Sequence, residues 1–253
     1  MMQVHVLASG SKGNSTYIQI GDTKILVDAG ISARRIKTSL ASIGVAIEEL
    51  NGILITHEHR DHISGLPTLT KKYQLPIYTR ADTFQSMYCR SLLSDACCNA
   101  IGDKIGIGEL KIECFNIPHD AADPIGFNIF GKDIKCTFAT DLGFVTSSVQ
   151  KALDHSDILI LEANHDVELL RNGAYPSYLK QRILSNRGHL SNADAAWALV
   201  RMKKQKHMKV FLAHLSEENN RPKIAWETVQ KIISAQGESL DIRLASQNEV
   251  VSL

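Results

Sequence analysis

Residues 56–62 read Thr-His-Glu-His-Arg-Asp-His and place three of the chain's ten histidines within six positions. They follow a short apolar run, Gly-Ile-Leu-Ile, that is typical of a buried strand. In a segment that leaves a strand, His57 and His59 point the same way. Asp61 and His62 lie where the chain turns into a helix. Imidazole and carboxylate groups at this density suit zinc, manganese or iron, so the stretch predicts a metal site.

The length and composition of the chain favour one large α/β domain, residues 1–253. Its 253 residues are 44% hydrophobic, which is ample material for a core. The net charge is only +1, so no general field attracts the protein to nucleic acid or to a membrane. Attraction for a polyanion must therefore come from local basic patches and from bound metal ions.

The cysteines and the N-terminus indicate a cytoplasmic protein. The five cysteines are odd in number and none has CxxC spacing, which fits reduced thiols better than a disulfide framework. The first residues lack the basic and apolar regions of a signal peptide, and no run of 18 apolar residues occurs. We therefore expect a soluble protein without a membrane partner.

Periodicity predicts alternating strands and helices along the chain. The predicted strands are 2–8, 16–20, 24–27, 52–55, 77–78, two runs within 105–117, 126–130, 134–138, 157–161, 209–213, 242–245 and 250–251. The predicted helices are 32–43, one ending at 73, 81–93, 145–153, 178–184, one from 192 to about 206, and 222–236.

Several of these strands end in a polar side chain. These side chains are Asp28, His119, Asp141, Glu162 and His214. Asp28 could cap the helix that begins near Ser32, or it could accept the second ring N–H of a ligand histidine; the sequence leaves both readings open. Asp141 could simply begin the next helix, but the other ligand candidates favour a bridging carboxylate.

Two polar loops are candidates for substrate contact. Residues 9–15 form a Ser, Gly and Asn-rich loop that could bind an anion, although glycines in such a loop more often only turn the chain. Within it, Ser11 and Asn14 are the predicted contacts. Asn164 and His165, at the exit of the strand 157–161, are the other two.

The densest basic run of the chain comprises Arg201, Lys203, Lys204, Lys206 and Lys209. A solvated helix end is its simplest explanation. If the substrate is DNA, we expect this run to contact phosphates and to make binding depend on salt.

In order, Asp28, the 56–62 motif, His119, Asp141 and His214 resemble the metallo-β-lactamase superfamily over nearly the whole chain. That resemblance implies an α/β (α+β) fold with four αββα layers, in which two mixed β-sheets are flanked by helices and two divalent ions, zinc and/or manganese, lie at one rim. It also implies that one ion is held by His57, His59 and His119. The other would be held by Asp61, His62 and His214, with Asp141 bridging.

Departures from well-known branches of the superfamily narrow the expected chemistry. The β-lactamases usually have Cys at the position of Asp141, and the oxygen-handling di-iron branch has Glu at the position of His59. Glu162 and His189 are similar to the pair that the transfer-RNA 3′-processing branch uses near its scissile phosphate. The resemblance therefore implies a phosphodiester hydrolase, although the tRNA-binding arm and the large β-CASP insertion are missing.

The closest resemblance is to the YycJ/WalJ (VicX) group. It rests on the loop 9–15 and on three further stretches, 118–124, 162–166 and 214–220. The group's known activity implies DNA exonuclease action from the 5′ ends of duplexes. In the mechanism that follows, hydroxide between the metals attacks phosphorus and Asp61 orients it. His189, positioned by Glu162, protonates the departing 3′ oxygen.

Two other functions remain as hypotheses. A small-molecule metallo-hydrolase, such as a cyclic phosphodiesterase or a thioesterase, would need a deep and narrow pocket. A binding protein that keeps the metals only as structure is the third hypothesis. The presence of Asp141, Glu162 and His189 disfavours it, because a purely structural site does not need them. His189 could alternatively only cap a helix.

Overall fold

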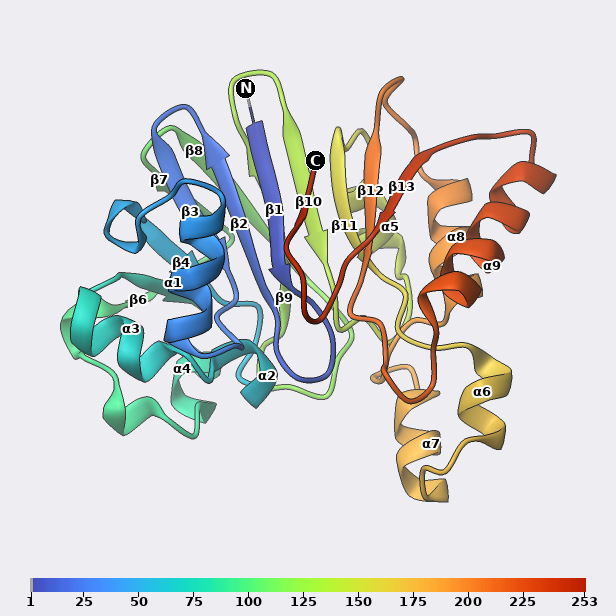
Figure 1. Ribbon diagram of the computed structural model, residues 1–253, viewed down its shortest axis with the longest axis horizontal. Coiled ribbons are helices and arrows are strands. Elements are labelled where there is room, and N and C mark those ends of the chain that lie inside the picture. The colour runs from blue at the N-terminus through green and yellow to red at the C-terminus, as the bar shows by residue number, and fades with distance from the viewer. Residues whose placement is uncertain (1) are drawn as a thin grey trace.

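The computed structural model describes residues 2–253, which form two seven-stranded mixed sheets (Figure 1). In spatial order, the first sheet contains β14 (Val251–Ser252), β1 (Met2–Ala8), β2 (Ser15–Ile20), β3 (Thr23–Val27), β4 (Gly52–Leu54), β5 (Ile77–Thr79) and β6 (Cys98–Ala100). The second contains β13 (Asp241–Leu244), β12 (Lys209–Ala213), β11 (Ile158–Glu162), β10 (Lys135–Ala139), β9 (Ile125–Phe130), β8 (Leu110–Asn116) and β7 (Lys104–Ile107).

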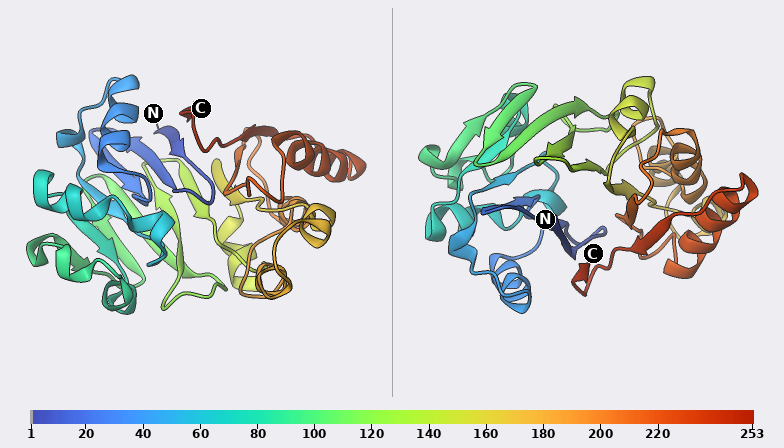
Figure 2. Two further views of the ribbon diagram at one scale, coloured as in Figure 1. Left: turned by 60° about the horizontal axis from the view of Figure 1, so that its bottom comes forward. Right: turned by 90° about the horizontal axis from the view of Figure 1, so that it is seen from above.

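Helices cover the outer face of each sheet (Figure 2). On the side of the first sheet lie α1 (Ala33–Ser42), α2 (Arg60–Ile63), α3 (Leu66–Tyr73) and α4 (Ala81–Ser86). On the side of the second lie α5 (Ser147–Leu153), α6 (Val167–Asn172), α7 (Ser177–Ile183), α8 (Asn192–Arg201) and α9 (Pro222–Ala235). Short 3₁₀ helices span Ile47–Glu49, Arg90–Leu92 and Asp95–Cys97.

Three buried apolar clusters separate these layers. The first packs α1 and α3 against one face of the first sheet and includes Ile36, Leu69 and Ile53. The second lies between the two sheets and contains residues such as Val6, Ile25 and Phe127, and the third fills the space between the second sheet and helices α5, α8 and α9. Because each sheet is buried on both faces, the predicted four-layer αββα fold is confirmed.

Parallel pairing brings several strand ends to one rim of the molecule. β10, β11 and β12 run parallel and in register, with Ala139 opposite Leu161. In the first sheet β3 and β4 are also parallel. Since parallel strands point their carboxyl ends to the same edge, the residues that follow them gather at the lower rim in Figure 1.

Most predicted elements are found, but two helices are shorter than predicted. The helix predicted for 81–93 ends at Ser86 and is followed by a 3₁₀ turn. The helix predicted to reach about 206 ends at Arg201. There the backbone of Lys203 donates to Asp154 Oδ1 (2.8 Å) and accepts from His155 N (2.7 Å), so contacts to the end of α5 replace further helical bonds. Helix α6 was not predicted.

Within residues 2–253, no helix combines the length and the apolar content that crossing a bilayer requires.

Candidate metal centre

The residues of the predicted metal site come together at the rim. His57 follows β4, and Asp61 and His62 lie in α2, the short helix that begins directly after His59. Asp141 follows β10 and His214 follows β12. These side chains follow three strands, β4, β10 and β12, so the sandwich positions the whole group.

One set of three imidazoles forms around His57. Nitrogens of His57, His59 and His119 all lie within 4.8 Å of one another. Their ring centroids are 4.6 to 5.0 Å apart, and His57 is fully buried. Three imidazoles at this spacing suit a single divalent ion.

The second set combines a carboxylate with two imidazoles. Asp61 Oδ2 lies 3.4 Å from His62 Nε2 and 3.5 Å from His214 Nε2. Asp141 lies between the two sets, because its Oδ2 is 3.3 Å from His62 Nε2 and its Oδ1 is 3.9 Å from His119 Nε2. All seven predicted ligands are therefore brought into one cluster.

The buried atoms of this cluster fit a metal ion. His57 Nε2, Asp141 Oδ2 and His214 Nε2 are buried without a hydrogen-bond partner among residues 2–253. Such unpaired polar atoms are costly, and divalent metal bound by the two ligand sets would satisfy all three. Nitrogen and carboxylate ligands without thiolate match zinc, manganese or iron. The site therefore suits divalent metal.

Electrostatics within the cluster keep its carboxylates ionised. Burial would raise the pKa of Asp141, but His214 and His62 outweigh it and hold that pKa below its usual range. Burial would likewise lower the pKa of His214, yet Asp141, Asp61 and Glu162 raise it to about 10. Without metal, His214 therefore carries a proton that an incoming ion must displace.

Asp28 contacts a ligand histidine and does not cap a helix. Its Oδ2 is 2.8 Å from His62 Nδ1, and its Oδ1 accepts from the backbone N–H of Thr56 at 2.9 Å. The cap of α1 is Ser32, whose side chain accepts from Arg35 N. Because Asp28 binds Nδ1, the Nε2 atom of His62 is turned toward Asp61 and Asp141.

The contact between Asp28 and His62 predicts an effect on metal affinity. Asp28→Asn should lower metal affinity by roughly 10–100-fold, because the ring of His62 loses its charged acceptor. Metal titration followed by elemental analysis measures the change. Ser32→Ala is the matched control, since it should cost about 1 kcal/mol of stability and leave metal affinity unchanged. Equal metal affinity in Asp28→Asn and the parent protein would contradict the assignment.

Glu162 is a positioning residue that fixes two histidines at once. Its Oε1 accepts from His189 Nδ1 and from His214 Nδ1, both at 2.8 Å. Its Oε2 accepts the backbone N–H groups of Leu142 (2.8 Å) and Leu190 (2.9 Å). The side chain is fully buried and cannot reach a substrate.

The bonds of Glu162 also set its charge and the orientation of the two rings. Burial would raise its pKa, but His189 and His214 outweigh burial and hold that pKa below its usual range. An ionised carboxylate only accepts, so both Nδ1 atoms carry hydrogen and both Nε2 atoms are free to act elsewhere. The His189 and His214 rings lie 5.2 Å apart, which places a candidate proton donor beside a candidate ligand.

Three site residues adopt a strained backbone. Asp28, Asp141 and His214 have φ values of 61°, 57° and 56°, in the left-handed region that non-glycine residues rarely enter. Each follows a strand, so the strained turn directs the side chain back over the rim. Strain of about 1–3 kcal/mol per residue is typical of functional sites.

A cavity of about 210 Å³ opens over the metal cluster. His59, Asp61, Asp141, His189 and His214 form part of its wall. The predicted substrate contacts Ser11 and Asn164 also line it. Asn164 donates to the backbone oxygen of His214 at 2.8 Å, which holds that loop in place.

The other two predicted substrate contacts do not line the cavity. Asn14 is buried, and its Nδ2 lies 3.4 Å from Asp61 Oδ2 and 3.2 Å from His62 Nε2. His165 is only 2% exposed, and burial lowers its pKa to about 4. Asn14 therefore contacts the ligand loop and His165 is buried, and neither is among the residues that line the cavity.

Part of the cavity wall was not predicted. Tyr175, Leu179, Arg182 and Ile183, from α7 and the turn before it, face the cavity. Arg182 Nε pairs with Asp120 beside His119. The spacing of Leu179, Arg182 and Ile183 along a predicted helix was the available signal, because residues three and four apart share a helix face.

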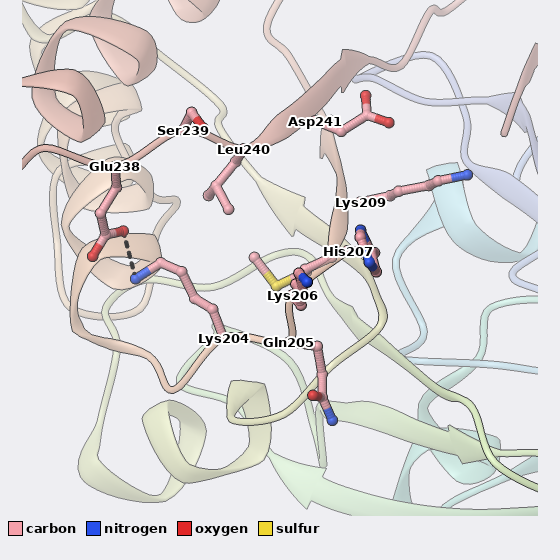
Figure 3. Close-up of a pocket in the computed structure, with 10 residues that line it drawn as sticks. Lys204, Gln205, Lys206, His207, Lys209, Glu238, Ser239, Leu240 and Asp241 are labelled. Atoms are coloured by element: carbon pink, nitrogen blue, oxygen red, sulfur yellow. Dashed lines mark ion pairs between the residues drawn. The ribbon is translucent and has the colours of Figure 1, made fainter.

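The basic run 201–209 lies away from this cavity. Residues 204–209 line a separate hollow of about 560 Å³, where Lys204 pairs with Glu238 at 2.7 Å (Figure 3). Lys209 begins β12, whereas His214 follows its end, so strand rise places them roughly 16 Å apart at opposite rims. Within residues 2–253, no member of this run lines the cavity over the metal cluster.

Known proteins match this chain over most of its length. A family model described as a beta-lactamase superfamily domain matches residues 23–214. Exodeoxyribonuclease WalJ of Streptococcus pneumoniae serotype 2 is 41% identical over 229 residues, covering 88% of this chain and 85% of WalJ. Exodeoxyribonuclease YycJ of Bacillus anthracis is 36% identical over 237 residues, covering 92% and 89%.

The chain belongs to the WalJ/YycJ family of the beta-lactamase superfamily. Solved structures support the fold of this family member. The metallo-beta-lactamase fold protein YhfI from Bacillus subtilis superposes with a TM-score of 0.74 at 19% identity, covering 100% of this chain and 99% of YhfI. The short form of human tRNase Z gives 0.66 at 17%, covering 99% and 98%.

Proposed function

We propose that this protein is a metal-dependent DNA exonuclease that removes nucleotides from the 5′ ends of duplexes. The observation that carries the proposal is the Glu162–His189 pair, which lies against the metal cluster in a chain 41% identical to an exodeoxyribonuclease. His189 Nδ1 is 2.8 Å from Glu162 Oε1 and 3.8 Å from Asp141 Oδ1. A phosphodiester with an unactivated leaving oxygen needs such a proton donor.

The chain's own residues have separate roles in this proposal. Glu162 holds the His189 ring so that Nε2 can deliver a proton to the departing 3′ oxygen. Asp61, on the cavity wall, orients the attacking water. Bound divalent ions would lower the pKa of that water and neutralise the phosphate oxygens, which a protein of net charge +1 does not do alone.

The proposal includes two divalent ions, zinc or manganese, per chain. His57, His59 and His119 would hold one, and Asp61, His62 and His214 the other. Asp141 would bridge them, because its two oxygens approach histidines of both sets. A bridging carboxylate has no purpose with a single ion.

Metal content tests the dinuclear part of the proposal. Saturated protein should hold about two ions per chain, and Asp61→Ala or His214→Ala should lower this to about one. Elemental analysis after removal of free metal gives the numbers. A plateau near one ion that neither substitution changes would contradict the dinuclear assignment.

Substrate preference tests the DNA part. Metal-loaded protein should cleave duplex DNA much faster than a cyclic nucleotide or an acyl thioester, and a chelator should abolish all cleavage. The three substrates are compared at equal concentration by product chromatography. Faster hydrolysis of the cyclic nucleotide or the thioester would instead assign the site to a small-molecule hydrolase.

A further inference from the structure

Two short helices, α6 and α7, lie in the chain between Glu162 and His189, the proposed proton-donating pair. The chain leaves β11 at Glu162, forms α6 and α7, and returns at His189. In Figure 1 these helices project beyond the sheets, at the same end of the molecule as α2. Residues of α7 and of the turn before it line the cavity, so a duplex end that enters the cavity lies beside α7.

Helix α7 faces the cavity with one side and solvent with the other. Leu179, Arg182 and Ile183 line the cavity. At 100° per residue, the positions that flank this face are Tyr178 and Lys180. Tyr178 is 72% exposed, the highest value among the exposed large apolar side chains. An exposed aromatic beside basic residues is typical of nucleic-acid contact.

Helix α7 is held firmly against the catalytic loop. The backbone N–H of His189 donates to Ile183 O at 3.1 Å, and His119 Nδ1 lies 3.1 Å from Gly188 O. Gly188 leaves no room for a side chain, since a Cβ there would lie 2.1 Å from Ile183 O. A ligand that contacts α7 is thus placed in a fixed relation to His189.

The segment 167–187 is strongly basic for a chain of nearly zero net charge. It contains four Lys or Arg residues (171, 180, 182 and 187) and one acid, Glu168, so its net charge is four minus one, or +3. Arg182 uses Nε to pair with Asp120, and its guanidinium has further donors. Lys180 contacts only a backbone oxygen, that of Arg171, among residues 2–253.

We infer that this α6–α7 surface, defined by Arg171, Tyr175, Tyr178, Lys180, Arg182 and Arg187, binds the phosphate backbone of duplex DNA next to the cleaved end. The inference rests on the proposed nuclease function and names the surface that function uses. It replaces the basic run 201–209, which lies at the opposite rim. Arg182 contacts the phosphates nearest the cavity, and Lys180 and Arg187 contact those farther along the duplex.

Salt-dependent DNA binding tests the inference. The double variant Lys180→Ala/Arg187→Ala and the charge-matched control Lys203→Ala/Lys206→Ala are each made in a His189→Ala background, which slows cleavage of the probe. A fluorescent blunt duplex is titrated at several salt concentrations, and anisotropy gives Kd. Metal content is measured for each protein, so that loss of the metal site is recognised separately.

The α6–α7 variant should bind roughly 10–100-fold more weakly at low salt. The negative slope of log K against log salt should become shallower by about two, since each lost phosphate contact removes about 0.9 from its magnitude. The control should match its parent. A control that loses as much as the α6–α7 variant, or an α6–α7 variant equal to the control, would overturn the inference while leaving the nuclease function standing. Metal-loaded protein without any substitution that neither binds nor cleaves duplex DNA would overturn both.

Discussion

His189→Ala is expected to slow DNA cleavage by roughly 10²–10⁴-fold, the usual contribution of a positioned general acid. The 3′ oxygen of DNA is a poor leaving group and needs the proton that His189 Nε2 would supply. On bis-p-nitrophenyl phosphate the departing phenolate needs little protonation, so the loss there should be much smaller. Initial rates on both substrates at saturating metal measure the difference.

The control for this substitution is His207→Ala, which removes an exposed histidine at the opposite rim. Its rates on both substrates should equal those of the parent protein, and metal content should be unchanged in both variants. Equal losses on DNA and on bis-p-nitrophenyl phosphate in His189→Ala would mean that His189 acts through the metal site or the fold. The general-acid role would then be wrong.

Asp141→Ala should reduce activity below detection and remove at least one metal ion, because the carboxylate approaches both ligand sets. Helix and strand content should stay near normal, since the three apolar clusters do not depend on one rim residue. Elemental analysis, circular dichroism and rates on DNA measure the three effects.

A second variant separates the charge of Asp141 from its backbone conformation. Asp141 has φ 57°, a region that asparagine tolerates better than alanine, so Asp141→Asn keeps the turn and removes only the charge. It should lose activity and metal as Asp141→Ala does. Asp133→Ala, an exposed acid in the turn before β10, is the matched control and should keep both. Full activity in Asp141→Asn would contradict the ligand set.

The resemblance to the metallo-β-lactamase superfamily implied the fold and the ligand sets, and strand geometry explains why the ligands meet. His57, Asp141 and His214 each follow an apolar run that is typical of a buried strand, and parallel strands deliver such residues to one edge. The role of Asp28 could not be decided in this way. A cap and a hydrogen-bond acceptor need the same carboxylate, and only the 2.8 Å contact with His62 Nδ1 distinguishes them.

Other features depend on three-dimensional packing that periodicity does not report. The burial of Asn14 and His165 follows from how the loops fold over the ligands, although both residue types are common on surfaces. The basic run 201–209 is close in sequence to His214, yet β12 carries the two to opposite rims. Glu162 accepts hydrogen bonds from His189 and His214, which lie 27 and 52 positions further along the chain.

Cleavage of a duplex labelled at one 5′ end tests the central claim most directly. Metal-loaded protein is mixed with this duplex and, separately, with the same duplex labelled at the 3′ end, and products are resolved at early times. The account predicts that the 5′ label appears first in the shortest products, while the 3′ label shortens gradually from full length. Early release of the 3′ label, internal fragments alone, or intact duplex in both reactions would contradict it.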